Sequence, residues 1–299
     1  MKRALVTGAT GFIGGRLVHA LVRDGWTVHC LCRPESDPRP LDPQAIVLRS
    51  QVQPDAIAEA MREAKPDIVF HLASLYLSDH EARDVDRLIS SNVLFTALLA
   101  EAMTAVGATR LVNTGTAWQR FGVKDASDYN PVNLYAATKQ AASDVLRYYH
   151  DARKLSLVTL ELFDTYGRGD PRRKIVQLLV DAAMSGDTLG LSPGEQVIDL
   201  THVDDIIGAF LLAGRRLLDD DDCPRNERFL LSGERATLRD LAILVGDTLG
   251  RPMNVEFGAR AYRSREVMEP VVPGPEDRLP NWHPQRSLVN CLPELAGIG

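Results

Sequence analysis

Cysteine is scarce in this chain, with four residues among 299, and their placement excludes two common uses. Cys30, Cys32, Cys223 and Cys291 stand at spacings that match neither a metal-binding set nor a redox motif. Cys30 and Cys32 are two apart in an apolar stretch, so both side chains point to one face of a strand and we expect them in the core. This usage favours a reducing compartment, the cytoplasm.

An excess of basic charge is also lacking, because 34 Lys and Arg face 40 Asp and Glu, for a formal net charge of -6. This balance argues against nucleic acid as a general partner.

No apolar run approaches the ~20 residues that span a bilayer. Met1-Lys2-Arg3 runs straight into the first apolar strand, leaving no room for a signal peptide. We therefore expect no membrane partner. What is plentiful is apolar composition, 45% of the chain, which can fill the core of one large domain or two closely joined ones.

The most informative local pattern lies near the start, where an apolar strand over residues 4–6 runs into three spaced glycines. Gly8 allows a tight reversal, Gly11 removes a side chain where a pyrophosphate approaches, and Gly14 lets the next helix lie against the sheet. The next helix is indicated by apolar residues at helical spacing, Ile13, Leu17, Val18, Leu21 and Val22, and Gly25 is expected to end it. Its N-terminal amides suit an anion. With a second strand over 28–31, the pattern predicts a dinucleotide site.

Arg33 bears on which dinucleotide binds. In such folds an acidic residue at the end of the second strand holds the ribose diol of NAD, whereas a basic one accommodates the 2′-phosphate of NADP. Here the strand ends in Cys32-Arg33, with no carboxylate until Glu35. A guanidinium is permanently charged and matches phosphate oxygens in a bidentate fashion. We therefore expect NADP(H) rather than NAD; the alternative is a surface arginine at a strand end.

Tyr135 and Lys139 lie four apart in an alanine-rich, helix-favouring stretch, so their side chains share one face. A phenol normally loses its proton near pH ~10, and a neighbouring ammonium would stabilise the phenolate and lower that pKa. The lysine can also reach ribose hydroxyls. Alone, this spacing is more often two partly exposed helix residues; downstream of the glycine turn it predicts an acid–base pair beside a cofactor.

A third catalytic residue is expected at the end of the strand over 110–117. This stretch is apolar and ends in small hydroxyl residues, and strand ends at that edge of a parallel sheet point into the cofactor crevice. Thr116 is our candidate for orienting the reacting oxygen, with Thr114 behind it. The alternative is a threonine that only satisfies a turn amide.

Strand and helix signals alternate as far as Gly167 and predict an α/β fold, a Rossmann-type doubly wound parallel sheet with a smaller C-terminal α/β substrate-binding domain. Further strands are expected over 67–72 and 155–163, and a long helix over 88–106 ended by Gly107. We expect residues 1–167 with 197–221 to form the cofactor domain. Residues 168–196 with 222–299, richer in proline, glycine and charge, would form the substrate domain, and 279–284 read as a turn-rich clasp.

These motifs together resemble the extended short-chain dehydrogenases/reductases of the nucleotide-sugar branch. The family's glycine pattern matches Gly8, Gly11 and Gly14, its Tyr-x-x-x-Lys matches Tyr135 and Lys139, and its catalytic Ser/Thr aligns best with Thr116. Residues 70–74, 162–167 and 199–205 are also family-like, and the likeness covers nearly the whole chain. Within the family, residues 114–119, 133–140 and 192–196 look most like the CDP-abequose synthase type, which reduces a 4-keto-6-deoxy sugar nucleotide.

The resemblance also implies contacts with the cofactor and the substrate. Besides the glycines, Arg33 and Lys139, the cofactor contacts would be Thr10, Phe12, Ile13, Leu72, Ala73, Ser74, Asn92 and Leu162. The substrate contacts would be Thr116, Trp118, Asp164, Arg172, Lys174 and Gln196. The run Arg172-Arg173-Lys174 is a candidate for the substrate diphosphate, with a solvated helix start as the alternative. A nucleotide sugar is thus the expected partner, together with a second copy of the chain, because family helices carrying positions like Leu94 and Tyr135 pack against a twin.

Departures from the family narrow the chemistry. Sugar-nucleotide 4,6-dehydratases place Asp and Glu after the catalytic threonine, where this chain has Ala117 and Trp118. We therefore expect no dehydratase. A reductase consumes its hydride and draws on NADPH, which agrees with Arg33, whereas a 4-epimerase keeps its NAD bound. The expectation is a 4-ketoreductase; the alternatives are an epimerase and a catalytically silent NADP sensor.

We expect no metal site. Asp219-Asp220-Asp221-Asp222 lacks the alternating ligands of a calcium loop and fits a solvated loop. His202, Asp204 and Asp205 are interpreted as structural, with Asp204 or Asp205 capping a helix over 206–212. His71 is expected as a hydrogen-bonded residue of the cofactor crevice rather than a ligand.

Overall fold

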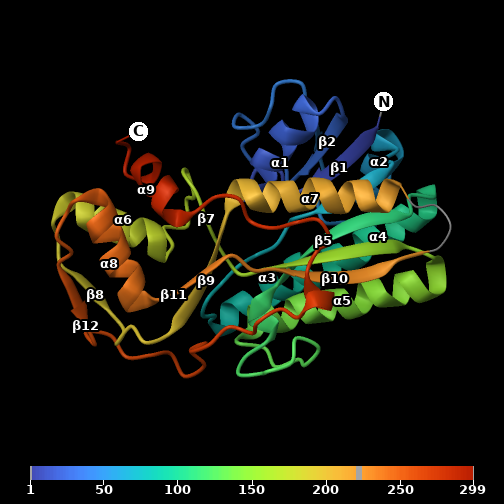
Figure 1. Ribbon diagram of the computed structural model, residues 1–299. Helices are drawn as coiled ribbons and strands as arrows, with labels where there is room; N and C mark the ends of the chain where they lie inside the picture. Colours follow the sequence, from blue (N-terminus) through green and yellow to red (C-terminus); the bar gives the residue numbers. More distant parts are fainter. Residues whose placement is uncertain (1, 220–223, 299) are drawn as a thin grey trace.

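The computed structural model describes residues 2–219 and 224–298, and its largest feature is a seven-stranded parallel sheet (Figure 1). The strands, in spatial order, are β10 (Asn226–Leu231), β6 (Ser156–Leu162), β5 (Arg110–Thr116), β4 (Ile68–His71), β1 (Arg3–Thr7), β2 (Thr27–Cys32) and β3 (Ile46–Arg49). The order reverses between β1 and β4, and ligands of doubly wound sheets bind at such a switch point. The predicted Rossmann-type fold is confirmed.

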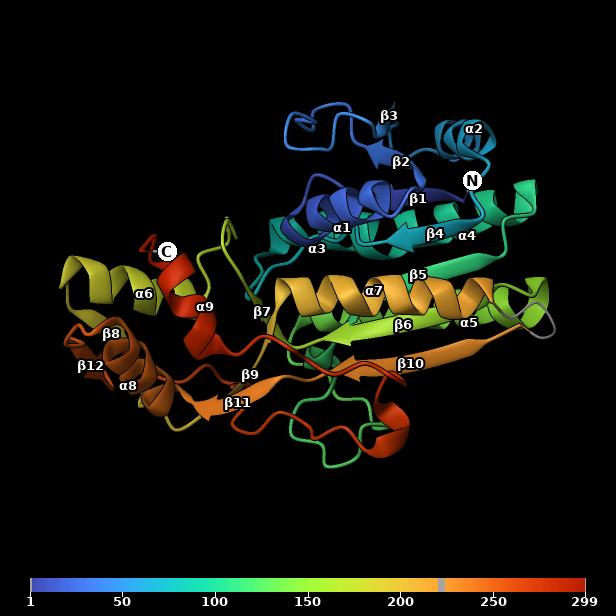
Figure 2. The same cartoon turned by 45° about the horizontal axis from the view of Figure 1, so that its top comes forward.

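Helices cover both faces of this sheet (Figure 2). On one face lie α1 (Phe12–Arg23) and α7 (Val203–Leu218), which pack against each other. The other face is covered by α2 (Pro54–Ala64), α4 (Phe95–Val106) and α5 (Leu134–Arg153). The two layers of apolar side chains hold the carboxyl ends of β1, β4 and β5 in fixed positions, where the functional side chains lie.

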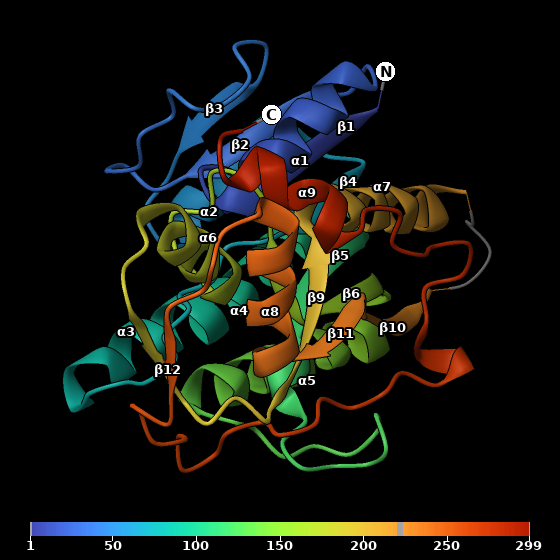
Figure 3. The same cartoon turned by 60° about the vertical axis from the view of Figure 1, so that its left-hand side comes forward.

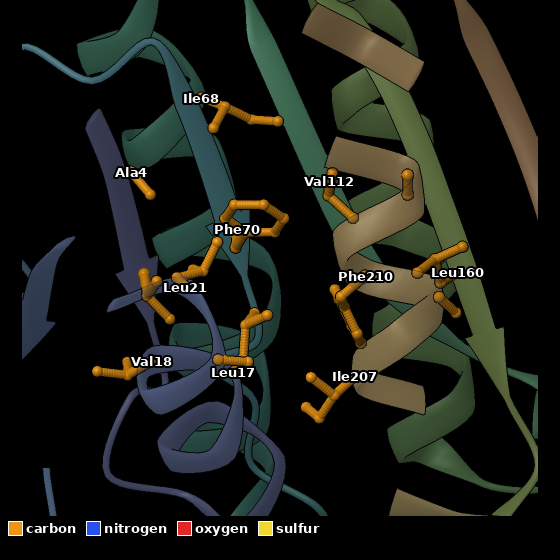
Figure 4. Close-up of a cluster of buried hydrophobic side chains, with 14 of the residues drawn as sticks. Ala4, Leu17, Val18, Leu21, Ile68, Phe70, Val112, Leu160, Ile207 and Phe210 are labelled. Carbon is orange, nitrogen blue, oxygen red and sulfur yellow. The ribbon is translucent and has the colours of Figure 1, made fainter. Parts of the chain in front are cut away.

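The α1–α7 layer shows how closely helix and sheet approach (Figure 4). Leu17 and Leu21 of α1 and Phe210 of α7 are completely buried together with Phe70 of β4. Gly214 of α7 lies over the Phe70 ring, and a Cβ there would stand 2.8 Å from Phe70 Cζ. This close packing explains a glycine in the middle of α7.

The first helix agrees with its prediction. α1 spans Phe12–Arg23, and its buried face includes Leu17, Val18 and Leu21. Gly25 follows with φ +80° and donates its N–H to Val22 O at 2.9 Å, so the predicted glycine stop is confirmed. Cys30 and Cys32 are both buried in β2, also as predicted.

The long helix expected over 88–106 begins earlier and changes its winding. α3 (Val85–Ile89) continues through a π-helical turn at Ser90–Leu94 into α4, which Gly107 ends with φ +74°. Among the described residues, the run Ala82–Val106 alone is long and apolar enough by composition to cross a membrane. The expectation that no stretch approaches this length was therefore wrong. Much of its apolar side packs in the core, with Leu99 and Met103 completely buried.

A smaller unit lies beyond the carboxyl ends of the large sheet (Figure 3). It contains the sheet β11 (Glu234–Thr237), β9 (Val197–His202), β7 (Asp164–Tyr166) and the pair β12 (Val255–Phe257), β8 (Leu189–Leu191). Its helices are α6 (Ile175–Ser185), α8 (Leu238–Leu249) and α9 (Leu288–Leu295), which share one apolar cluster.

Strand pairing crosses the boundaries of the expected domain ranges. β7 and β9 lie in the ranges given to the cofactor domain, and they pair with each other in the small sheet, where β9 also pairs with β11. β10 lies in the range given to the substrate domain, and it extends the large sheet beside β6. The chain therefore crosses between the two sheets several times. The division into two domains stays a proposal.

The start of α7 also differs from its expectation. The helix begins at Val203, and His202 Nδ1 caps it by accepting from Asp204 N at 3.2 Å, so neither Asp204 nor Asp205 is the cap. Asp205 holds the C-terminal clasp instead: its carbonyl accepts from Trp282 Nε1 at 2.9 Å and its carboxylate from Arg286 N at 3.0 Å. Of the acidic run, Asp219 ends α7, whereas 220–222 and Cys223 lie outside the described residues.

Candidate active site

The glycine turn after β1 is a cradle that side chains would fill. Gly8 has φ +66°, and a Cβ there would stand 2.6 Å from Ala73 N; at Gly14 it would stand 2.1 Å from Gly8 O. Gly11 is the N-cap residue of α1 and provides no side-chain cap, which leaves the first amides of the helix for another acceptor. Backbone donors at a helix N-terminus that no side chain satisfies suit a phosphate group.

A buried histidine fixes the loop that faces this turn. His71, at the end of β4, is completely buried, with Nδ1 2.7 Å from Thr7 Oγ1 and Nε2 2.9 Å from Thr96 Oγ1. Thr96 donates its own proton to Asn92 O at 2.8 Å, so it accepts from His71, which is the neutral Nε2–H tautomer. Burial, with the nearby Lys139 charge, lowers the pKa of His71 to about 3. The expected hydrogen-bonded crevice histidine is thus observed.

Asn92, in the π-helical turn, ties the loop after β4 to the catalytic helix. Its Oδ1 accepts from Leu75 N at 2.8 Å and Ser74 Oγ at 3.2 Å. Its Nδ2 donates to Leu75 O at 3.0 Å and Thr138 Oγ1 at 2.9 Å. Because these partners use both ends of the amide, the side chain of Asn92 positions Ser74 and α5.

Tyr135 and Thr116 meet where β5 ends beside α5. The Tyr135 phenol hydrogen-bonds with the hydroxyls of Ser74 and Thr116. Thr116 also accepts from Trp118 N at 3.3 Å, so it satisfies a turn amide as well as facing the tyrosine. Thr114 donates instead to His71 O at 2.9 Å, which ties β5 to β4. The hydroxyls of Tyr135 and Thr116, the two expected catalytic hydroxyls, are therefore adjacent.

The electrostatics of Tyr135 and Lys139 differ from the expectation that the ammonium lowers the pKa of the phenol. Burial raises the pKa of the Tyr135 phenol; the Ser74 hydrogen bond, the Arg172 charge and the Thr116 hydrogen bond act in the opposite direction. Lys139 is not among these influences. The side chain of Lys139 is itself buried, and desolvation lowers the pKa of its ammonium to about 8. Tyr135 is therefore protonated at neutral pH, the state required of a proton donor.

Arg33 directly follows β2, at the position expected from the sequence. Its side chain is 72% exposed and pairs with Glu35, Nε to Oε1 at 3.3 Å. Arg49, at the end of β3, donates to Ser36 O at 3.2 Å and to Pro34 O, which fastens the loop after Arg33. Two guanidinium groups thus stand at the ends of neighbouring strands.

A cavity of about 380 Å³ lies between the sheet edge and the smaller unit. Of the expected substrate contacts, Trp118, Asp164, Lys174 and Gln196 line it. Lys174 Nζ is 2.8 Å from Asp164 Oδ1. Gln196 is 8% exposed, and its Oε1 is a buried acceptor without a partner.

Arg172 takes a different place from its neighbours. Its guanidinium binds the Asp170 carboxylate at 2.6 and 2.7 Å and lies over the Phe12 ring, 5.5 Å from the centroid, beside the glycine turn. Arg173 and Lys174, but not Arg172, line the cavity.

Among the lining residues that sequence reasoning missed are Tyr76, Arg260, Arg263 and Arg265. The three arginines fall within six residues of an acidic chain, so the argument applied to 172–174 would also have found them. Tyr76 carries no such signal. Among the described residues, no group of three or more His, Cys, Asp or Glu is arranged to hold a metal ion.

The sequence profile of the NAD dependent epimerase/dehydratase family matches residues 4–223. The chain belongs to this family, the extended short-chain dehydrogenases/reductases. Curated relatives include the CDP-abequose synthase of Yersinia pseudotuberculosis, 28% identical over 90% of this chain and 91% of the relative. The UDP-glucose 4-epimerase of Mycolicibacterium smegmatis is 29% identical over 85% of each chain.

Solved structures of the same fold include two that carry NAD. The UDP-glucose 4-epimerase of Thermus thermophilus, in complex with NAD, has a TM-score of 0.83 at 21% identity, over 99% of this chain and 98% of that chain. The dTDP-glucose 4,6-dehydratase of Streptomyces venezuelae, with NAD bound, has a TM-score of 0.84 at 23% identity, over 99% and 96%. These likenesses establish the fold.

Proposed function

We propose that this protein is a nucleotide-sugar oxidoreductase that reduces the 4-keto group of a nucleotide-linked 4-keto-6-deoxyhexose with NADPH. The observation that carries the proposal is the placement of the Tyr135 phenol, which shares helix α5 with Lys139 and faces the Thr116 hydroxyl at the end of β5. The relationship to CDP-abequose synthases supports reduction, and that to 4-epimerases supports a nucleotide sugar.

The residues around the glycine turn fit a nicotinamide dinucleotide. A Cβ at Gly8 or Gly14 would strike backbone, and the N-terminal amides of α1 have no side-chain cap. The turn would hold the pyrophosphate, and the Lys139 ammonium would hold the ribose hydroxyls. Arg33, with Arg49 beside it, would hold a 2′-phosphate and so favour NADP(H) over NAD.

In the proposed mechanism, bound NADPH supplies the hydride that reduces the ketone carbon. Tyr135 donates its proton to the ketone oxygen, which becomes the hydroxyl of the product. Thr116 hydrogen-bonds that oxygen as it gains charge. Solvent then restores the proton of Tyr135, so one ketone, one NADPH and one proton give one alcohol and one NADP⁺.

The cavity supports an anionic substrate. Arg173, Lys174, Arg260, Arg263 and Arg265 line it. We propose that members of this set hold the diphosphate, while the unpaired Gln196 Oε1 accepts from the nucleoside. Arg172, beside Phe12, would act nearer the cofactor phosphates.

A 4-epimerase is the second candidate, because UDP-glucose 4-epimerases are among the relatives. Incubation with NADPH and CDP-, dTDP-, GDP- and UDP-linked 4-keto-6-deoxy sugars separates the two. A reductase oxidises NADPH in step with the ketone consumed. An epimerase is purified with NAD bound and interconverts sugars with no net loss of NADPH.

Tyr135→Phe tests the proposed proton donor directly. The variant keeps the ring and removes the hydroxyl, so we expect turnover to fall at least ~100-fold while the dissociation constant of NADPH stays within ~3-fold. Stopped-flow absorbance and fluorescence titration measure the two quantities. An undiminished turnover number would remove Tyr135 from the mechanism.

A further inference from the structure

Tyr76 is the central ring of an aromatic row that ends on the proposed proton donor. It lies in the loop after β4, with its ring 5.1 Å from that of Tyr135 at an interplanar angle of 83°. On its other side the Trp118 ring lies 5.6 Å away at 61°. Tyr76 and Trp118 both line the cavity. Two aromatic side chains therefore line the cavity, and one of them contacts the ring of the proposed proton donor.

The backbone on both sides of Tyr76 is fixed. Asn92 accepts from Leu75 N at 2.8 Å and donates to Leu75 O at 3.0 Å. After the tyrosine, Asn133 Nδ2 donates to Ser78 O at 2.8 Å. Asn133 is also the N-cap of α5, the helix that carries Tyr135. The ring of Tyr76 and the phenol of Tyr135 are thus held in one frame.

Part of the surface around this row is carbon, because Ala117, Val132 and Phe163 line the same cavity. Charged groups lie on another side of Tyr76: Asp164, Arg263 and Arg172 act on its phenol, and Lys174 Nζ lies 5.6 Å from its ring centroid and 2.8 Å from Asp164 Oδ1. On the carbon side, a hydroxyl group pressed against the ring faces would find no hydrogen-bond partner.

We propose that Tyr76 and Trp118 select a sugar whose exocyclic carbon, next to the reacting carbonyl, is a methyl and carries no hydroxyl. The inference rests on the proposed function. That exocyclic carbon is two bonds from the carbonyl carbon. When Tyr135 and Thr116 hold the carbonyl oxygen, the exocyclic carbon therefore lies within contact range of the aromatic row. A methyl group packs on aromatic faces, whereas a hydroxyl loses its water partners there. Rejection of an added hydroxyl by an apolar pocket reaches about 10- to 100-fold.

The test compares matched substrates in the oxidative direction. Each pair shares one nucleotide and differs only at C6, methyl against hydroxymethyl, with NADP⁺ as hydride acceptor and absorbance as readout. For the wild type we expect kcat/KM to favour the methyl sugar by at least ~10-fold. Tyr76→Phe keeps the ring and should keep this ratio within ~3-fold. Tyr76→Asn supplies a polar partner, and we expect the ratio to fall ~10-fold, mainly because the hydroxymethyl sugar improves.

Trp118→Gln is a second variant, which we expect to lower the ratio in the same direction. NADPH titration and thermal unfolding identify which variants are folded. The inference is overturned by a wild-type ratio near one, or by a folded variant, Tyr76→Asn or Trp118→Gln, that keeps the wild-type ratio; the proposed function survives either result. If the wild type oxidises neither sugar of any pair and reduces no ketone, the proposed function fails and the inference falls with it.

Discussion

At the scale of single residues, the buried Lys139 ammonium lowers the stability of the protein without cofactor, although it is needed for the proposed function. Its pKa falls from the ordinary 10.5 to about 8, so the folded protein holds this charge unfavourably at neutral pH. A shift of this size corresponds to about 3 kcal/mol. Where a cofactor ribose would hydrogen-bond the ammonium, the protein without cofactor gives it few partners, and stability is lost in exchange for binding.

Lys139→Met should therefore raise the free energy of unfolding by about 1–3 kcal/mol at pH 7 while abolishing most of the activity. Because the folded-state pKa lies below the ordinary value, the loss of stability is full below pH 8 and is relieved as pH rises towards 10.5. The difference between variant and wild type should shrink over that range in urea titrations. A variant that is less stable at pH 7 would show that the ammonium is well solvated.

Arg33 gives a separate test of cofactor choice. Arg33→Asp replaces the cation with the carboxylate that a ribose diol favours, so we expect the ratio of NADPH to NADH dissociation constants to move at least ~10-fold towards NADH. Arg39→Asp is the control, because Arg39 is similarly exposed and pairs with Asp37 in the neighbouring loop. An equal change of this ratio in both variants would indicate an effect of the overall charge instead of a contact between Arg33 and the cofactor.

At the scale of elements, the turn between β1 and α1 depends on where each glycine lies. Gly14→Ala would place a Cβ 2.1 Å from Gly8 O, which the turn can accommodate only by moving. We expect a loss of about 2 kcal/mol in stability and weaker NADPH binding. Gly15→Ala is the matched control: the atom nearest to its new Cβ would be Ala9 O at 3.4 Å, and alanine favours the helix by up to about 1 kcal/mol. Calorimetry and NADPH titration compare the two.

The elements also show what the sequence could predict. The glycine turn, α1 and the pair Tyr135 and Lys139 are local patterns, whose spacing determines their geometry. The sequence could not assign β9 and β10 to a sheet, because a short strand carries no mark of the sheet it joins; pairing with β7 or β6 is decided by the rest of the fold.

The same distinction holds in the site. Thr116 could be placed because strand ends of a parallel sheet converge. Tyr76 could not, because its meeting with Tyr135 and Trp118 depends on a loop path that Asn92 and Asn133 hold through hydrogen bonds distant in sequence. The lowered pKa of Lys139 likewise follows from burial, which the side-chain pattern did not reveal.

At the scale of the whole molecule, large apolar side chains remain exposed on α3, on the π-helical turn and on α5. Ile89 and Leu94 are 43% and 46% exposed, and Tyr148 of α5 is 57% exposed. We expect a homodimer that buries these side chains. The double variant Ile89→Asp, Leu94→Asp should halve the mass measured by light scattering. Ile243→Asp, at a 60% exposed site on α8, should leave it unchanged. A wild-type monomer would contradict the expectation.

The anchorage of the C-terminal tail has a mechanical consequence. Trp282 and Arg286 bond to Asp205 near the start of α7, and α9 then packs on α6 and α8 of the smaller unit. The tail therefore connects the large unit to the smaller unit, so a separation of the two units wide enough to admit a bulky substrate must stretch or break these contacts. How far the units can separate and how firmly the tail is held are thus linked, and removal of the chain after Leu279 would allow the two units to separate further.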